Sequence, residues 1–172
     1  RYREFYNSIR DLVPPETMIF ATGGDIDFFA NWNAALLETC ARELQYLTTH
    51  FVAGMHEMRK ADADRDFKWA ADFAIPVGVA RVLEPIRQQI DANPLTRGRV
   101  KLAYTEWLFW GPDEEASVPR YDNLGGAVVA AGWMNMLLSH ADFVPIANMT
   151  GLIEFGGIHK KRGCVFVTPQ YW

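Results

Sequence analysis

The sequence predicts an α/β fold built on a parallel sheet, and three observations support this class. Segments with helical spacing of apolar residues alternate along the chain with short apolar runs that are typical of strands. The helical segments are long enough to return the chain to the start of a parallel neighbour, which needs a connection of about a dozen residues or more. No linker, repeat or low-complexity segment divides the 172 residues, so we expect a single domain.

The first half of the chain predicts two helices that alternate with two strands. Apolar residues recur at helical spacing from Tyr2 to Val13, and Pro14 and Pro15 end that helix because proline cannot continue the hydrogen-bond ladder. The expected elements are then a strand over 17–22 with a turn at Gly23 and Gly24, a helix over 34–42 capped by Asn31 or Asn33, and a strand over 44–50 that ends at His50.

The second half begins with a charged run at 57–66 that is typical of a solvated loop. The helical stretch over 67–90 contains Pro76 and Pro85, which we expect to break or kink it. The expected elements after it are a strand over 99–106, a loop with Pro112 and Pro119, a helix that begins near Asp122 or Asn123, and strands over 143–147 and 163–167. One face of that last helix is formed by Leu124, Ala127, Val128, Ala131, Met134, Asn135 and Leu138.

Composition and charge exclude two classes of partner. Hydrophobic residues make up 49% of the chain, charged residues make up 22%, and the net charge is −4. A mildly acidic chain whose densest basic run is 159–162 has no long-range attraction to phosphate backbones, so we expect no nucleic-acid partner. No stretch approaches the roughly 20 apolar residues that cross a bilayer, so we expect no membrane partner. Localisation stays open, because a cut amino end would not show a signal peptide.

Cysteine and histidine spacing indicates neither a metal nor a cofactor. Cys40 and Cys164 fit neither a metal-ligand spacing nor a disulfide framework, and we expect buried free thiols. The histidines His56, His140 and His159 form no ligand spacing with a carboxylate, and His140, near a helix end, is expected to contact the terminal carbonyls. No glycine-rich phosphate loop is present.

Glu106 is the strongest candidate for catalysis. It is the last residue of the apolar strand 99–106, and aromatic residues that include Trp107 and Trp110 follow it before a Gly-Pro stop. In a barrel of parallel strands and helices, catalytic groups lie at the carboxyl ends of strands, and a carboxylate beside tryptophan rings is typical of sugar-cleaving sites. We therefore predict that Glu106 is a glycosidase nucleophile; the alternative is a structural ion pair with an arginine such as Arg120.

These residues carry a family resemblance. The segment Tyr104-Thr-Glu-Trp-Leu-Phe-Trp110 resembles the Asp-Glu-Trp-x-x-Trp nucleophile segment of glycoside hydrolase family 51, the α-L-arabinofuranosidases. The stretch 122–148 is similar to that family's helix and following strand, and His50 resembles a family histidine at the end of a strand. Order and spacing agree over essentially the whole chain. A histidine satisfied within the sheet is the alternative interpretation of His50.

The resemblance implies a retaining α-L-arabinofuranosidase that releases terminal arabinofuranosyl residues from arabinose-containing oligosaccharides and polysaccharides. Glu106 would be the nucleophile, and His50, Trp107 and Trp110 would bind the substrate. The family fold is a (β/α)8 TIM-type barrel followed by a β-sandwich, and the family's acid/base glutamate lies in a Gly-Asn-Glu motif on an earlier strand. No Asn-Glu pair occurs in this sequence.

Length and ends indicate an incomplete barrel. The chain is shorter than the roughly 200 to 250 residues that a closed eightfold barrel takes. We therefore expect residues 1–172 to form roughly the second half of a catalytic barrel, as one incomplete domain that lacks the earlier strands and the β-sandwich. Without the acid/base glutamate, we expect this piece alone to be inactive.

Three departures from the family pattern leave arabinose specificity open. Thr105 replaces the aspartate that precedes the nucleophile, Val52 stands where the family often has a tyrosine, and Gly151 stands where many members have a glutamine. They motivate the alternative that the parent protein is a non-catalytic carbohydrate-binding or structural relative of the glycosidase barrel. Core packing is the alternative role of Trp107 and Trp110. A homo-oligomeric parent also stays open.

Overall fold

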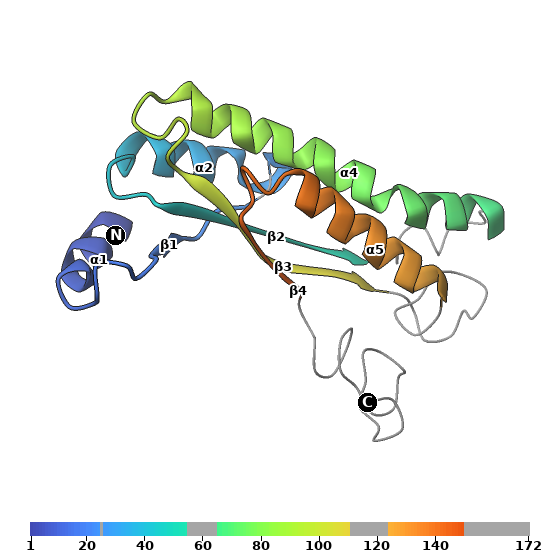
Figure 1. Ribbon diagram of the computed structural model, residues 1–172. Coiled ribbons are helices and arrows are strands. Elements are labelled where there is room, and N and C mark those ends of the chain that lie inside the picture. The colour runs from blue at the N-terminus through green and yellow to red at the C-terminus, as the bar shows by residue number, and fades with distance from the viewer. Residues whose placement is uncertain (25, 55–64, 111–123, 150–172) are drawn as a thin grey trace, which may run out of the picture. The chain divides into compact units, whose positions relative to one another are not determined.

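The fold is an α/β arrangement around one four-stranded parallel sheet, as the sequence predicted. A computed structural model describes residues 1–24, 26–54, 65–110 and 124–149 (Figure 1). The strands lie in the order β1-β2-β3-β4, so strands that follow one another in the chain are neighbours in the sheet. The elements are α1 (Tyr2–Arg10), β1 (Phe20–Ala21), α2 (Ile26–Thr39), β2 (Tyr46–Gly54), α4 (Arg65–Ala92), β3 (Lys101–Trp110), α5 (Leu124–Ser139) and β4 (Ile146–Met149).

Two compact units divide the chain, and each has its own core. The first comprises 1–50, 81–105 and 141–146, and the second comprises the remaining segments. In the first unit, α2 and the carboxyl-terminal half of α4 lie on the same side of the strands (Figure 1). Its fully buried side chains include Leu44, Leu47, Leu83, Ile86, Ile90 and Leu102. The core of the second unit includes Val79, Trp107, Val129, Trp133 and Met136.

Helix α2 begins earlier than the sequence predicted, and its predicted caps are wrong. It starts at Ile26, so Asn31 and Asn33 lie inside the helix. Asn33 is fully buried, where its Nδ2 donates to the Gly24 carbonyl at 2.7 Å and its Oδ1 accepts from the Gly24 amide at 3.0 Å. A buried amide that satisfies both backbone groups of one glycine ties the helix to the turn before it.

Helix α4 is one helix of 28 residues, so the predicted break at Pro76 or Pro85 does not occur. Pro76 is buried, and a Cβ added to Gly132 of α5 would lie 3.3 Å from its Cγ. The bare glycine surface therefore lets the proline ring pack closely on α5. This tertiary contact offsets part of the free energy that the helix loses because proline cannot donate a backbone hydrogen bond.

Strands β2 and β3 both continue past the predicted ends. His50 lies inside β2, which runs to Gly54, and Glu106 lies inside β3, which runs to Trp110. Most of the residues that extend the strands, such as Phe51, Val52 and Trp107, are aromatic or β-branched, and such residues favour a pleated, half-buried surface. The prediction that both side chains stand at the last strand position is therefore wrong: His50 lies at the middle of β2, and Glu106 lies just past the middle of β3.

The face of α5 that the sequence selected is the exposed face. Leu124 is 81% exposed and Leu138 is 71% exposed. The buried residues are Gly125, Gly126, Val129, Trp133, Met136 and Leu137. Because α5 is apolar all round, the spacing of its apolar residues could not show which side faces the core.

The turn from α4 into β3 is held by one arginine and one glycine. The Arg99 guanidinium donates to the carbonyls of Leu44, Ala41 and Leu95, at 2.5 Å for Leu44 and 2.9 Å for Leu95. Gly98 has φ of 68°, a left-handed conformation that side chains with a Cβ rarely adopt. These contacts determine where β3 starts in the first unit.

An exposed ion pair joins α4 to the entry of β4 in the same unit. Both terminal nitrogens of Arg87 contact Asp142, at 3.0 and 3.1 Å, and the guanidinium lies 4.6 Å from the centre of the Phe143 ring. The hydrogen bonds from Arg87 lower the pKa of Asp142. Because the pair is exposed, we expect it to orient this segment more than to stabilise it.

Replacing two glycines by alanine should change stability in opposite directions. Gly98→Ala should lower the free energy of unfolding by about 1 kcal/mol, because alanine is strained at positive φ. Gly78→Ala, inside α4 with no atom within 4 Å of the added Cβ, should raise it by about 0.5 to 1 kcal/mol. Urea denaturation of both variants measures the two shifts. Equal destabilisation by both would contradict the assigned backbone conformations.

The buried side-chain amide of Asn33 should contribute more to the free energy of unfolding than the exposed side-chain amide of Asn31. Asn33→Ala should lower the free energy of unfolding by about 2 to 3 kcal/mol, because it leaves the buried Gly24 amide and carbonyl without their partners. Asn31→Ala, on the exposed side of α2, is the matched control and should stay within about 0.5 kcal/mol of the parent chain. Thermal and urea denaturation measure both variants. An Asn33→Ala variant as stable as the parent chain would contradict the role of Asn33 in holding α2 to the Gly24 turn.

Candidate functional site

The turn that leaves β1 is held tightly against β2 in the first unit. The Gly23 amide donates to the Thr48 hydroxyl at 3.2 Å. A Cβ added to Gly23 would lie 2.4 Å from the Thr48 carbonyl oxygen, so only glycine fits at this close approach of two backbones. Together with the bonds between Asn33 and Gly24, these contacts fix the carboxyl end of β1.

Trp32 presents an exposed aromatic ring beside this turn, a role that the sequence did not predict. Its Nε1 donates to the Thr22 carbonyl at 2.6 Å, while the residue is 54% exposed. A ring that is exposed and yet oriented by a hydrogen bond can stack on a ligand at little entropic cost. The only signal in the sequence was a tryptophan between two asparagines shortly after a strand.

His50 lies on β2 with an exposed side chain. The residue before it, Thr49, is 3% exposed, and its carbonyl accepts a hydrogen bond from the Thr105 hydroxyl at 3.1 Å. The backbone next to His50 is thus held by the neighbouring strand, while the imidazole faces solvent. An exposed side chain on a fixed backbone is suited to binding a polar ligand.

Glu106 lies on β3 in the second unit and is half-buried. Its neighbours Tyr104 and Trp107 are 1% and 4% exposed. Glu106, like Thr105 before it, therefore keeps solvent-accessible surface between the buried residues Tyr104 and Trp107. Arg120, the alternative ion-pair partner, lies outside the described residues.

Trp107 packs in the core of the second unit. Its ring centroid lies 5.6 Å from that of Trp133 on α5, and Trp133 is fully buried. Phe51 extends the cluster, with its centroid 6.2 Å from Trp133. A sugar platform needs an accessible ring face, so the predicted substrate contact of Trp107 gives way to core packing.

The Trp107 contact also determines where Glu106 points. Successive side chains of a strand project to opposite faces. Because Trp107 packs on α5, Glu106 lies on the other face of β3. Trp110 is the last residue of β3, and its side chain lies outside the described part of the chain, as do the side chain of Val52 and the whole of Gly151.

The remaining predictions concern cysteine, histidine and bound ions. Cys40 is a buried free thiol, as predicted, and Cys164 lies outside the described residues. His140 Nδ1 lies 2.9 Å from the Met136 carbonyl oxygen, which confirms the predicted contact at a helix end. Within residues 1–24, 26–54, 65–110 and 124–149, no three side chains are grouped as metal ligands. Over the same ranges, no helix combines the length and the apolar character needed to cross a bilayer.

A hollow of about 420 Å³ lies elsewhere in the first unit, at the amino ends of strands. It is lined by Pro15, Glu16, Thr17, Met18, Gln45, Tyr46, Arg99 and Lys101. In parallel α/β sheets, ligands bind at the carboxyl ends of the strands. We therefore do not assign this hollow to the catalytic chemistry.

Comparison with known proteins identifies the fold. No protein-family model and no curated protein sequence matches the chain. Solved structures do match. The α-L-arabinofuranosidase from Thermotoga maritima in complex with arabinose has a TM-score of 0.67 at 21% identity, over 92% of this chain and 30% of that chain. The family 51 arabinofuranosidase from Xanthomonas axonopodis pv. citri has a TM-score of 0.68 at 16% identity, over 94% of this chain and 34% of that chain.

A third match extends the same pattern. The family 51 α-L-arabinofuranosidase from Bifidobacterium longum has a TM-score of 0.65 at 19% identity and is covered over 33% of its length. The chain thus spans about a third of the length of each of these three proteins. At such low identity the likeness shows the fold, and it agrees with the resemblance seen in the sequence. This chain has the fold of one part of the family 51 α-L-arabinofuranosidase barrel.

Proposed function

We propose that this chain is part of the catalytic barrel of a retaining glycosidase of the α-L-arabinofuranosidase type, with Glu106 as the nucleophile. The observation that carries the proposal is the position of Glu106: half-buried, on a parallel strand, and on the face opposite the outer helix α5. In barrels of this class, that face lines the barrel interior, and the active site lies at the carboxyl-terminal end of that interior.

The chemistry follows from a carboxylate in this position. In the first step, the Glu106 carboxylate attacks the anomeric carbon of a terminal arabinofuranosyl group, and the bond to the leaving oxygen breaks. A second carboxylic acid protonates that oxygen, then acts as a base on the water that hydrolyses the glycosyl-enzyme. In retaining enzymes the two carboxyl groups lie about 5 to 5.5 Å apart.

The acid/base group is expected from outside this sequence. The family motif for it is Gly-Asn-Glu, and the 172 residues hold no Asn-Glu pair. Residues 1–172 alone should therefore show no turnover, because one carboxylate cannot perform both steps. Activity belongs to the longer protein that contains this chain.

Three further residues are proposed to bind the sugar. His50 offers an exposed imidazole on β2, and Trp32 offers an oriented, exposed ring at the exit of β1. Trp110 keeps the role implied by the family resemblance. Arabinose-containing oligosaccharides are the proposed substrates, since a furanose ring has an apolar face for stacking and hydroxyls for hydrogen bonding.

A second candidate function is a non-catalytic carbohydrate-binding relative, and Thr105 favours it. Where the family resemblance places an aspartate before the nucleophile, the Thr105 hydroxyl donates to the Thr49 carbonyl. An ionised aspartate could only accept hydrogen bonds and could not make this contact. Because threonine is neutral, this position supplies no negative charge beside Glu106. Binding of sugar without turnover by the longer protein would support this candidate.

Replacing Glu106 should abolish turnover without abolishing binding. In the longer protein, Glu106→Gln should reduce hydrolysis of an aryl α-L-arabinofuranoside at least about 1,000-fold, because the amide is a poor nucleophile. Glu38→Gln, on the exposed side of α2, is the matched control and should retain activity. Calorimetry with an arabinose oligosaccharide should show that the inactive Glu106→Gln variant still binds it.

Chemical rescue sharpens the assignment. In Glu106→Ala, azide should enter the space left by the carboxylate and restore turnover, with a glycosyl azide as the product. Full activity of Glu106→Gln, or loss without any rescue of the alanine variant, would count against Glu106 as the nucleophile.

A further inference from the structure

Strand β3 is tightly packed over the three residues that precede Thr105. Leu102, Ala103 and Tyr104 are 0%, 0% and 1% exposed. Successive side chains of a strand project to opposite faces, so both faces of β3 are covered over this stretch. Thr105 and Glu106 are the first residues after it that keep accessible surface. Packing therefore restrains the strand up to Tyr104 and restrains it less at the proposed nucleophile.

The Thr105 hydroxyl supplies a polar restraint at this point. Its Oγ1 donates to the Thr49 carbonyl oxygen at 3.1 Å, which links β3 to β2. In a sheet the strands are joined by bonds between backbone groups, so a side-chain donor to a strand carbonyl is an addition to the ladder. Threonine is suited to this role, because its β-branched side chain adopts few rotamers and holds the hydroxyl in place.

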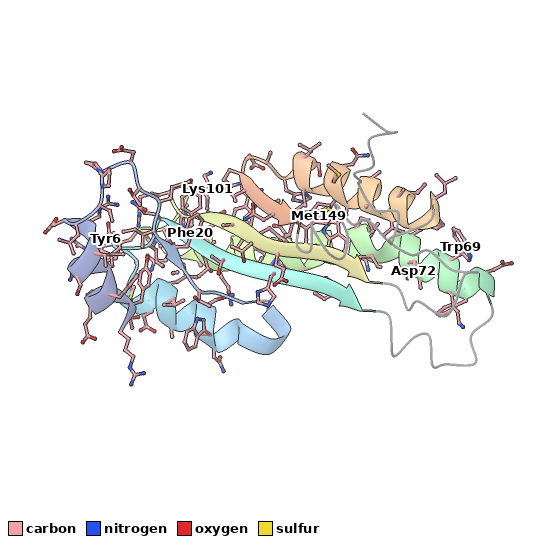
Figure 2. All side chains as sticks on the ribbon, turned by 90° about the horizontal axis from the view of Figure 1, so that it is seen from below. Tyr6, Phe20, Trp69, Asp72, Lys101 and Met149 are labelled. Carbon is pink, nitrogen blue, oxygen red and sulfur yellow. The ribbon has the colours of Figure 1, made fainter. Side chains whose placement is uncertain are left out.

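This bond joins residues that are already in register. At the start of the two strands, where Lys101 is labelled in Figure 2, the Lys101 amide donates to the Gln45 carbonyl at 3.2 Å. Counting four residues along each strand leads from that pair to Thr105 and Thr49. The two contacts share one offset, so β3 keeps the same register against β2 from its first residue to Thr105. A shift by one residue would turn the hydroxyl to the other face of the sheet and break the bond.

We propose that Thr105 is a positioning residue for the reaction. Through its bond to the Thr49 carbonyl, it holds the β3 backbone immediately before Glu106 in the place from which the carboxylate attacks the sugar. This inference rests on the proposed function, because that function makes Glu106 the nucleophile. A displacement of about 1 Å can cost an enzyme about 100-fold in rate, so a restraint on the adjacent residue bears directly on turnover.

The role depends on a hydrogen-bond donor at position 105. An ionised carboxylate only accepts hydrogen bonds, so an aspartate side chain would meet the Thr49 carbonyl oxygen with a second acceptor. Thr105→Asp introduces the residue that the family resemblance places before the nucleophile. In this chain it should nevertheless slow turnover, because it removes the bond to β2.

Removing the hydroxyl tests the proposal in the longer protein. Thr105→Val keeps the branched shape of the side chain and removes the donor. With an aryl α-L-arabinofuranoside as substrate, kcat should fall about 10- to 100-fold while KM stays nearly unchanged, because the lost restraint acts in the transition state. Thr105→Ser keeps a hydroxyl and should retain most of the turnover.

A second pair of variants separates the donor from the shape of the side chain. Thr105→Asn and Thr105→Asp introduce side chains of nearly the same size, but only the amide can donate to the Thr49 carbonyl. Thr105→Asn should therefore keep more turnover than Thr105→Asp. This pair decides the question if the valine variant does not fold.

The rates are expressed per active site, which are counted with an arabinofuranoside that labels the nucleophile and is released slowly. A hydroxyl with a merely structural role would change the number of labelled sites and leave the rate per site unchanged. Thr39→Val is the matched control, because it removes a hydroxyl that donates to a backbone carbonyl, that of Ala35, at 2.5 Å on the exposed side of α2. It should leave kcat and KM unchanged.

Two results would overturn the positioning role and leave the proposed function intact. One is full activity per labelled site in Thr105→Val while Glu106→Gln shows no turnover. The other is a Thr105→Asp variant as active as the parent protein, or more active, while Glu106→Gln again shows no turnover. Full activity of Glu106→Gln would instead defeat the proposed function, and the role of Thr105 would fail with it.

Discussion

The packing of Trp107 on Trp133 is the contact on which the proposed site depends. It joins β3 to α5 through two large buried rings, and it decides which face of β3 turns toward the helix. Since side chains alternate along a strand, the same contact places Glu106 on the opposite face. A one-residue shift in the register of β3 would exchange the faces of Trp107 and Glu106. It would bury a carboxylate and expose an indole, which would strongly destabilise the fold.

Within the first unit, the fold supplies rigid positions for other residues of the proposed site. Gly23 allows the exit of β1 to lie against Thr48, and Asn33 ties α2 to the same turn. The Thr105 hydroxyl links β3 to the Thr49 carbonyl beside His50. These are short polar contacts at buried or half-buried positions, where a hydrogen bond both stabilises and orients. A site built on strands and their first turns is held more precisely than one built on long loops.

The class of fold could be predicted from the sequence, whereas the catalytic role of Glu106 stays a prediction. Alternating helical and strand-like segments with long connections permit little other than a parallel sheet. The ends of β2 and β3 were missed because aromatic and β-branched residues past His50 and Glu106 continue the strand, and no proline or glycine interrupts them until Gly54 and Gly111. The core face of α5 was missed because its apolar residues lie on every side.

Single residues were harder to predict than elements. Trp107 stands in a segment rich in aromatic residues, and periodicity alone could not show that its ring packs in the core. Asparagine often caps helices, yet Asn33 lies buried inside α2 and hydrogen-bonds Gly24. The sequence could not show this, because only the folded turn brings Gly24 close to Asn33. Trp32 gave almost no signal in the sequence, since its exposure and its bond to Thr22 are properties of the folded chain.

The central claim is that Glu106 forms a covalent bond with the sugar. The most direct measurement is to treat the longer protein with a mechanism-based arabinofuranoside that forms the glycosyl-enzyme quickly and releases it slowly, and then to map the label by mass spectrometry of peptides. The account predicts the added mass of one pentosyl group on Glu106. Turnover of the substrate with the label on a different carboxylate would contradict it.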